Sequence, residues 1–157
     1  MTASTALKAV PLLGPAATWT DTGVVEEYTL DNGQRGIRAR TAIPAGRIIG
    51  VFGGVPVLYE LSPDGRITDP DAAQRAIQVA ADDRTVYALV APPGTPLVGI
   101  DYINHDCHDP TVTVENQVVL KTARDVAAGE PLRADYRPWD FVHYGERCWC
   151  SPPGCVI

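Results

Sequence analysis

Turn-forming residues stop every apolar stretch of this chain after a few residues. Residues 24–30 end at Asp31-Asn32-Gly33, and residues 47–52 end at Gly53-Gly54. Glycine, asparagine and aspartate tolerate the backbone conformations of tight turns, so each stretch is long enough for a strand and too short for a long helix. Gly 14 and Pro 14 among 157 residues argue against a helical bundle. The chain is therefore predicted to be mainly β, with few short helices.

The same pattern predicts individual strands and two hairpins. Apolar, β-branched or alternating residues mark four strands, at 24–30, 37–42, 47–52 and 55–61. The two hairpins pair 76–79 with 85–90, across residues 82–84, and 111–114 with 118–122, across Glu115-Asn116.

One short pattern occurs twice. Ile43-Pro44-Ala45-Gly46 and Val126-Ala127-Ala128-Gly129 each place an aliphatic residue three positions before a glycine, ahead of an expected strand. Two copies are too few for a stacked repeat architecture. We interpret them as two similar turns that feed two strands.

Length and chain breakers suggest one folded domain with two appendages. A chain of 157 residues corresponds to about one domain. Gly14-Pro15 interrupts the first residues, so residues 1–22 are predicted to be an N-terminal arm. Residues 23–140 form the predicted domain, and residues 141–157 form a cysteine-bearing tail.

The charge balance limits the classes of partner. Thirteen Lys and Arg against nineteen Asp and Glu give a net charge of −6. Direct nucleic-acid binding is not expected, because it depends on Lys and Arg. The acidic surface either attracts a basic protein or peptide, or only keeps the chain in solution. With no apolar run of about 18 residues and a poor signal peptide, we expect no membrane association and a cytoplasmic location.

The cysteines are concentrated late in the chain. Cys148, Cys150 and Cys155 form a C-x-C-x4-C pattern, and Cys107 is the remaining cysteine. Four thiolates complete a tetrahedral structural zinc shell, and a reducing compartment disfavours disulfides. A zinc site made by all four is the favoured interpretation; buried thiols or a disulfide are the alternative. His108 is a competing ligand or, more simply, a loop residue.

Two polar segments are candidate site elements. Asn104 and His105 carry both donors and acceptors and suit a small polar ligand, although a turn that caps a strand is the simpler interpretation of this segment taken alone. Tyr136, at the end of residues 129–136, either hydrogen-bonds in a site or fills the core.

Together these segments resemble the SET-domain family of S-adenosylmethionine-dependent lysine methyltransferases. Residues 33–46 resemble its opening glycine-containing strand and turn. Asn104-His105-Asp106-Cys107 matches its N-H-S-C segment, with Asp106 in place of Ser, and residues 129–136 are similar to its G-E-E-L-x-x-D-Y segment. The cysteine tail looks like the post-SET zinc element. The resemblance covers roughly residues 24–155.

The resemblance implies a fold of several small sheets with a C-terminal pseudoknot and a zinc-bound tail. Residues 23–140 would be the SET domain and 141–157 the post-SET element. The implied activity is methyl transfer from S-adenosylmethionine, most simply to a protein lysine, with zinc in a structural role. Two alternatives remain: a small-molecule tailoring enzyme that reuses the cofactor pocket, even for a reaction other than methylation, and a non-catalytic module that binds the cofactor or a peptide.

The resemblance also implies residue roles. Tyr136 would be the catalytic hydroxyl at the methyl-transfer channel, and Tyr87 and Tyr102 would line that channel or, preferably, pack in the core. Ala134 stands where the family usually has Phe or Tyr, which implies a thinner channel wall. The implied cofactor-binding residues are Arg35, Gly36, Tyr102, Asn104, His105 and Trp149, and the implied zinc ligands are Cys107, Cys148, Cys150 and Cys155.

Overall fold

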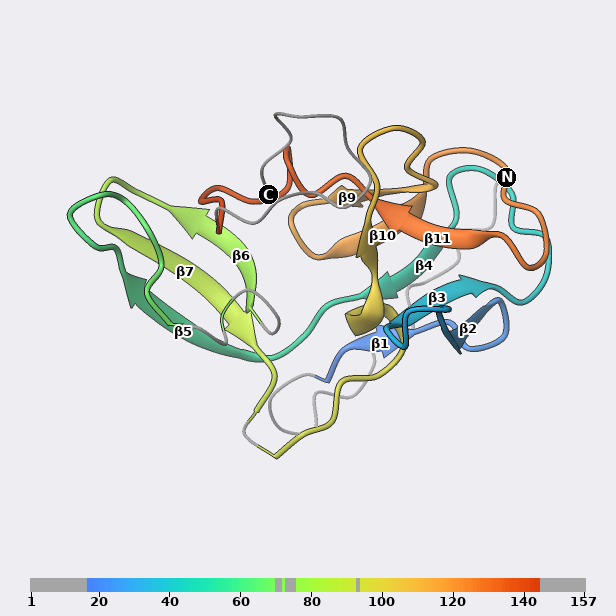
Figure 1. Cartoon of the computed structure of the whole chain (residues 1–157), viewed down its shortest axis with the longest axis horizontal. Helices are drawn as coiled ribbons and strands as arrows, with labels where there is room; N and C mark the ends of the chain where they lie inside the picture. Colours follow the sequence, from blue (N-terminus) through green and yellow to red (C-terminus); the bar gives the residue numbers. More distant parts are fainter. Residues whose placement is uncertain (1–16, 70–71, 73–75, 93, 145–157) are drawn as a thin grey trace, which may run out of the picture.

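The computed structural model describes residues 17–69, 72, 76–92 and 94–144 of the chain (Figure 1). Within them the fold is mainly β with one short 3-10 helix, η1 (Gly99–Tyr102), which confirms the predicted fold class. The strands are β1 (Trp19–Thr20), β2 (Val25–Thr29), β3 (Arg35–Ala39), β4 (Ile48–Val51), β5 (Val55–Glu60), β6 (Ala76–Ala81), β7 (Thr85–Val90), β8 (Asn104–His105), β9 (Val112–Glu115), β10 (Val119–Thr122) and β11 (Pro131–Ala134).

The described strands form two sheets. The larger sheet has the order β1-β4-β10-β9-β11-β3-β2, and β8 pairs with β11 outside this path. The smaller sheet, β5-β7-β6, lies to one side of it (Figure 1, left). Non-consecutive neighbours such as β4 and β10 mean that segments far apart in the sequence must meet for the larger sheet to form.

The repeated turn pattern has a structural counterpart. Ile43 and Val126 form an antiparallel bridge, each backbone N–H donating to the other's carbonyl at 2.9 Å. Gly46 and Gly129 have φ values of 80° and 81°, which glycine adopts at little cost. The two turns therefore lie side by side and feed β4 and β11.

The core lies on the inward faces of these strands. The fully buried side chains include Ile37, Ile49, Leu120 and Leu132, from four strands of the larger sheet. β5 alternates between half-buried and exposed residues, as expected for a strand with one face on the core and one in solvent. Burial of apolar surface of this kind is the main favourable term in folding.

Most of the predicted strands are confirmed, with shifted ends. Both hairpins form antiparallel pairs, β6 with β7 and β9 with β10. The strand expected at 37–42 runs instead over β3, because the backbone from 40 onward turns toward the Ile43 bridge. The second hairpin turns at Asn116 and Gln117, with φ of 48° and 66°, rather than across Glu115-Asn116. The end of the predicted arm contributes β1, paired with β4.

The segment after β11 leaves the larger sheet and reaches β6. The Gln78 side chain donates to the Val142 carbonyl at 2.8 Å and accepts from its N–H at 2.9 Å. The pseudoknot, the domain boundaries and the zinc-bound tail stay predictions, since residues 145–157 lie outside the described ones. None of the helices in the described ranges is long and apolar enough to cross a membrane.

We expect Gly54→Ala to lower the free energy of unfolding by more than about 2 kcal/mol. Gly54 joins β4 to β5 with φ of 141°, and an added Cβ would lie 2.7 Å from the Val90 carbonyl oxygen and 2.9 Å from its backbone nitrogen. Both are backbone atoms held in a sheet, so neither moves aside cheaply. Gly65→Ala is the matched control, since Gly65 also has a positive φ, 77°, but open space around its Cβ position. Urea unfolding of the two variants measures the difference; equal losses would contradict the steric explanation.

Candidate active site

The site begins where β8 and β11 run parallel. Arg133 pairs with Asn104 and Ala134 pairs with His105, so both strands end at the same edge of the sheet. Tyr136 follows two residues after β11 and therefore lies beside the Asn-His segment. The register of one short parallel pair thus brings together two predicted site segments that are separated by about thirty residues of sequence.

His105 is buried and neutral. It is 2% exposed, and its Nδ1 accepts a hydrogen bond from the Tyr136 backbone N–H at 3.0 Å. Burial holds the pKa of His105 below its usual value, against an opposing influence from Asp135. An acceptor at Nδ1 places the proton of the neutral ring on Nε2. His105 therefore fixes the backbone at Tyr136.

Tyr136 is held by its hydroxyl and by its ring. The hydroxyl donates a hydrogen bond to the carbonyl of Ile103, the residue before β8. The ring lies 5.1 Å from the His105 ring and 5.8 Å from that of Trp139, the latter edge-on at 75°. Because the hydroxyl proton is engaged, the oxygen presents its remaining lone-pair capacity as an acceptor.

Asn104 joins this edge to the glycine-containing strand. Its side-chain Nδ2 donates to the Arg35 carbonyl at 3.1 Å. A Cβ on Gly36 would lie 3.1 Å from that same Nδ2 and 2.9 Å from the Leu30 side chain. Glycine at position 36 is thus what permits the close approach of Asn104 to β3.

The side chain of Arg35 is directed to other partners. Its guanidinium lies 4.8 Å over the Tyr102 ring and is ion-paired with Glu27. Tyr102 is half-buried and packs against the core cluster. Tyr87 is 43% exposed on β7, so the core packing preferred for it from the sequence is wrong.

The loop after β8 explains one departure from the family pattern. Asp106 stands where the family has Ser, and its Oδ1 accepts from the backbone N–H groups of His108 at 2.8 Å and Asp109 at 3.2 Å. Asp106 therefore closes a turn that carries Cys107, which is partly buried. The Cys107 carbonyl accepts from the Arg137 side chain at 3.4 Å.

Three of the four predicted zinc ligands, and Trp149 of the predicted cofactor-binding residues, fall in the tail. Cys148, Cys150, Cys155 and Trp149 all lie outside the described residues. Among the described residues there is no group of three or more potential metal ligands, as expected when only one of four proposed ligands falls within them. The zinc set therefore stays a prediction.

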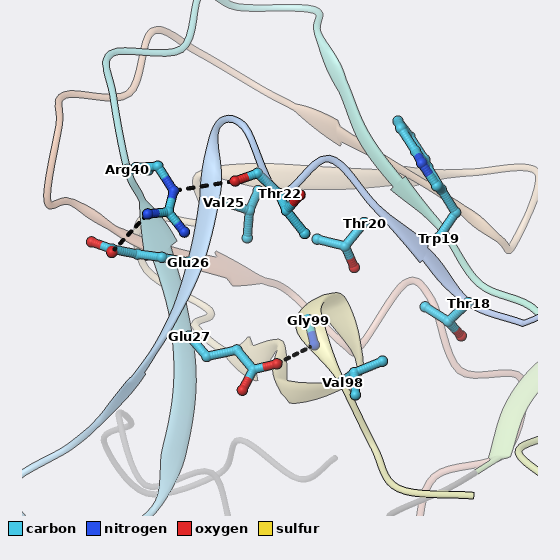
Figure 2. Close-up of a pocket in the computed structure, with 10 residues that line it drawn as sticks. All are labelled: Thr18, Trp19, Thr20, Thr22, Val25, Glu26, Glu27, Arg40, Val98 and Gly99. Atoms are coloured by element: carbon cyan, nitrogen blue, oxygen red, sulfur yellow. Dashed lines mark hydrogen bonds and ion pairs between the residues drawn. The ribbon is translucent and has the colours of Figure 1, made fainter.

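A cavity of about 550 Å³ is lined by residues of β1, β2, η1 and their flanking loops, and Figure 2 shows it. The Glu27 carboxylate in its wall accepts from the Gly99 N–H at 2.7 Å. Its lining includes none of the predicted site residues. Several of its polar side chains already have partners within the protein, as with Thr20, whose hydroxyl accepts from the Ile100 N–H at 3.0 Å.

Several residues around Tyr136 were not predicted from the sequence. Ile103 supplies the carbonyl for its hydroxyl, and buried Trp139 packs on its ring and lies 5.3 Å from the Phe52 ring. The sequence did offer one signal for Trp139, because it lies only three residues after Tyr136 and is therefore close to it in space. Gln78 and Gln117 carried no recognisable signal, because long polar side chains are ordinary in strands and turns.

We expect Asp140→Asn to be more stabilising at pH 8 than at pH 5. Burial raises the pKa of Asp140 to about 7. The folded state therefore binds this proton more tightly than the unfolded state, and the stability it contributes at low pH is lost as pH rises through 7. Because Asp140 is partly exposed to solvent, we expect the stabilisation by Asp140→Asn to differ between pH 5 and pH 8 by only about 2 kcal/mol in the free energy of unfolding.

The measurement is urea unfolding of both proteins at each pH. Asp83→Asn, on the exposed turn between β6 and β7, is the control. A difference between Asp140→Asn and the parent that stays constant from pH 5 to pH 8 would show that burial does not perturb this carboxyl group.

Comparison with known families agrees with the geometry. The family model described as SET domain matches residues 34–137, which include β3, β8, β11 and Tyr136. The chain belongs to the SET-domain family. Proteins of this family are in general lysine methyltransferases that use S-adenosylmethionine and act on peptides or proteins. No curated protein matches the chain significantly.

Proposed function

We propose that the protein is an S-adenosylmethionine-dependent methyltransferase that acts on a lysine of a basic protein or peptide in the cytoplasm. The observation that carries the proposal is the hydroxyl of Tyr136, whose proton is engaged by Ile103 beside the Asn104-His105 edge. This arrangement places the Tyr136 oxygen, which can act as an acceptor, at the point where the two family motifs meet. The family membership supports the reaction class.

The residues at this edge suit the cofactor. The methionine end of S-adenosylmethionine carries a carboxylate and an ammonium group, which require both donors and acceptors. The Asn104 amide, half-buried and within reach of the β3 backbone, offers both. Gly36 keeps the β3 backbone free of a side chain there. We assign cofactor binding to these two residues, to backbone groups of Arg35 and His105, and to Tyr102 and Trp149.

When bound, the cofactor supplies an electrophilic methyl group, so the protein needs no covalent nucleophile. Its residues orient the acceptor amine and keep water away. The Tyr136 oxygen accepts weak hydrogen bonds from polarised C–H groups or a stronger one from the amine. A dry, partly buried site also favours the neutral amine that the reaction requires, because burial penalises the charged form.

Zinc belongs to the proposal as a structural element. Cys107 is placed two residues after β8, and the three tail cysteines would join it. A closed shell of four thiolates leaves no position for substrate, so zinc would hold the tail near the site rather than take part in the reaction.

Incubation with methyl-labelled S-adenosylmethionine and a mixture of basic proteins tests the proposal. We expect label on lysine side chains, found by mass spectrometry of the digested proteins. Absence of cofactor binding in calorimetry at millimolar concentration would contradict it. Binding without transfer to any acceptor would favour the non-catalytic module.

A second candidate function rests on Ala134. This residue is 1% exposed in β11, and its methyl group replaces the aromatic ring usual in the family. A thinner wall at this point admits an acceptor of a different shape, as in a small-molecule tailoring enzyme. Label that appears only on small metabolites, and on no protein, would favour this function over lysine methylation.

A further inference from the structure

The segment that follows Tyr136 is held by two glutamines from different hairpins. Gln117, in the turn between β9 and β10, donates from its single side-chain Nε2 to the Trp139 carbonyl at 2.8 Å and to the Gln78 carbonyl at 3.0 Å. The Trp139 indole N–H returns a hydrogen bond to the Gln117 carbonyl at 3.0 Å. Both hydrogens of one amide group are thus used to join three segments of the chain.

The second glutamine extends the contact to the smaller sheet. Gln78 on β6 is fully buried, and its side-chain amide pairs with both backbone groups of Val142. Figure 1 shows the described end of the chain running beside β6. Gln78 and Gln117 therefore form a clamp, here called the glutamine clamp, that ties residues 139–142 to β6 and to the β9–β10 turn.

The turn that supplies Gln117 is strained. Asn116 and Gln117 both have left-handed backbones, with φ of 48° and 66°; asparagine suits the first of these positions, whereas glycine is the usual residue at the second. Strain of this kind persists only where the surroundings enforce it, and it is concentrated at functional sites. At position 117 a glycine would relieve the strain but could not supply the amide.

The clamp reaches the proposed catalytic tyrosine through one aromatic ring. Trp139 is 8% exposed, lies between the rings of Phe52 and Tyr136, and presents its edge to Tyr136. Displacement of Trp139 would remove one of the two aromatic rings that contact the Tyr136 ring, the other being His105. The orientation of the Tyr136 ring therefore depends in part on where Gln117 holds Trp139, while Ile103 holds the hydroxyl.

We propose that Gln117 is a positioning residue for methyl transfer, acting through Trp139 on the Tyr136 ring. The inference rests on the proposed function, since it assigns Gln117 to the same site. It also connects the smaller sheet to the reaction, because the amide that holds Trp139 is bonded to β6 as well.

The test compares two glycine substitutions in the same turn. Gln117→Gly and Asn116→Gly each relieve one left-handed residue, and only the first removes the clamp amide. We expect Gln117→Gly to lower kcat about tenfold with KM for S-adenosylmethionine within twofold, and Asn116→Gly to leave both unchanged. If Gln117 had only a structural role, Gln117→Gly would lower thermal stability without a selective loss of kcat over KM. Equal kcat in the two variants would overturn the inference.

A second readout does not require activity. In a ¹⁵N-labelled protein, the indole N–H resonance of Trp139, assigned with Trp139→Phe, should shift and exchange faster in Gln117→Gly and not in Asn116→Gly. If the parent protein transfers no methyl group, the proposed function fails, and this resonance still decides whether Gln117 positions Trp139. An unchanged resonance in Gln117→Gly would overturn the positioning claim, whatever the activity.

Discussion

Tyr136→Phe should lower the rate of methyl transfer by at least about a hundredfold, while the affinity for S-adenosylmethionine stays nearly unchanged. The substitution removes only the hydroxyl oxygen, the proposed acceptor, which is bonded to the carbonyl of Ile103 just before β8. The ring contacts with His105 and Trp139 remain, so the local packing is kept. Single-turnover rates measure the transfer step, and calorimetry measures cofactor affinity.

The lost hydrogen bond also has a structural consequence that needs a control. Ile103 is 7% exposed, and its carbonyl would lose a partner at a cost of about 1–3 kcal/mol. Tyr144→Phe is the matched control, because the Tyr144 hydroxyl also donates to a backbone carbonyl, that of Ala72 at 3.4 Å. If Tyr144→Phe slowed transfer as much as Tyr136→Phe, the effect would be one of stability, and Tyr136 would not be the catalytic hydroxyl.

Local sequence signals predicted the strands well because turns are encoded locally. The Asp31-Asn32-Gly33 and Gly53-Gly54 breaks mark real strand ends, and both predicted hairpins form. The error at the second hairpin has a clear cause. The glutamine clamp places Gln117 in a left-handed conformation that its residue type disfavours, so a contact with Trp139 overrides the local preference.

Which strands pair with each other in the sheets could not be predicted from local sequence patterns. The pairing of β8 with β11 joins residues about thirty apart, and the Ile43–Val126 bridge joins residues about eighty apart. Motif order placed Asn104, His105 and Tyr136 in one site through the family resemblance, and their geometry supports that grouping. The partners that hold Tyr136, Ile103 and Trp139, depend on packing that no local pattern specifies.

Cys107→Ser should remove the metal and with it most of the cofactor affinity. If Cys107 and the three tail cysteines share one zinc ion, loss of one thiolate opens the shell, and structural zinc contributes about 10–16 kcal/mol in small zinc-binding peptides. The purified parent should contain about one zinc per chain by elemental analysis. The variant should contain much less, and calorimetry should show at least tenfold weaker binding of S-adenosylmethionine.

His108→Ala distinguishes a shell of four thiolates from one that uses the neighbouring histidine. The His108 side chain is exposed, while its backbone N–H keeps its bond to Asp106, so the turn that carries Cys107 survives the substitution. We expect full zinc content in His108→Ala, because a shell of four thiolates is complete without it. If His108→Ala lost its zinc while Cys107→Ser kept it, His108 rather than Cys107 would be the zinc ligand. Because Cys107 and His108 both lie within three residues of the end of β8, zinc at either residue would still draw the tail toward the edge where Asn104 and Tyr136 meet. Cofactor affinity should therefore fall with zinc content in both variants.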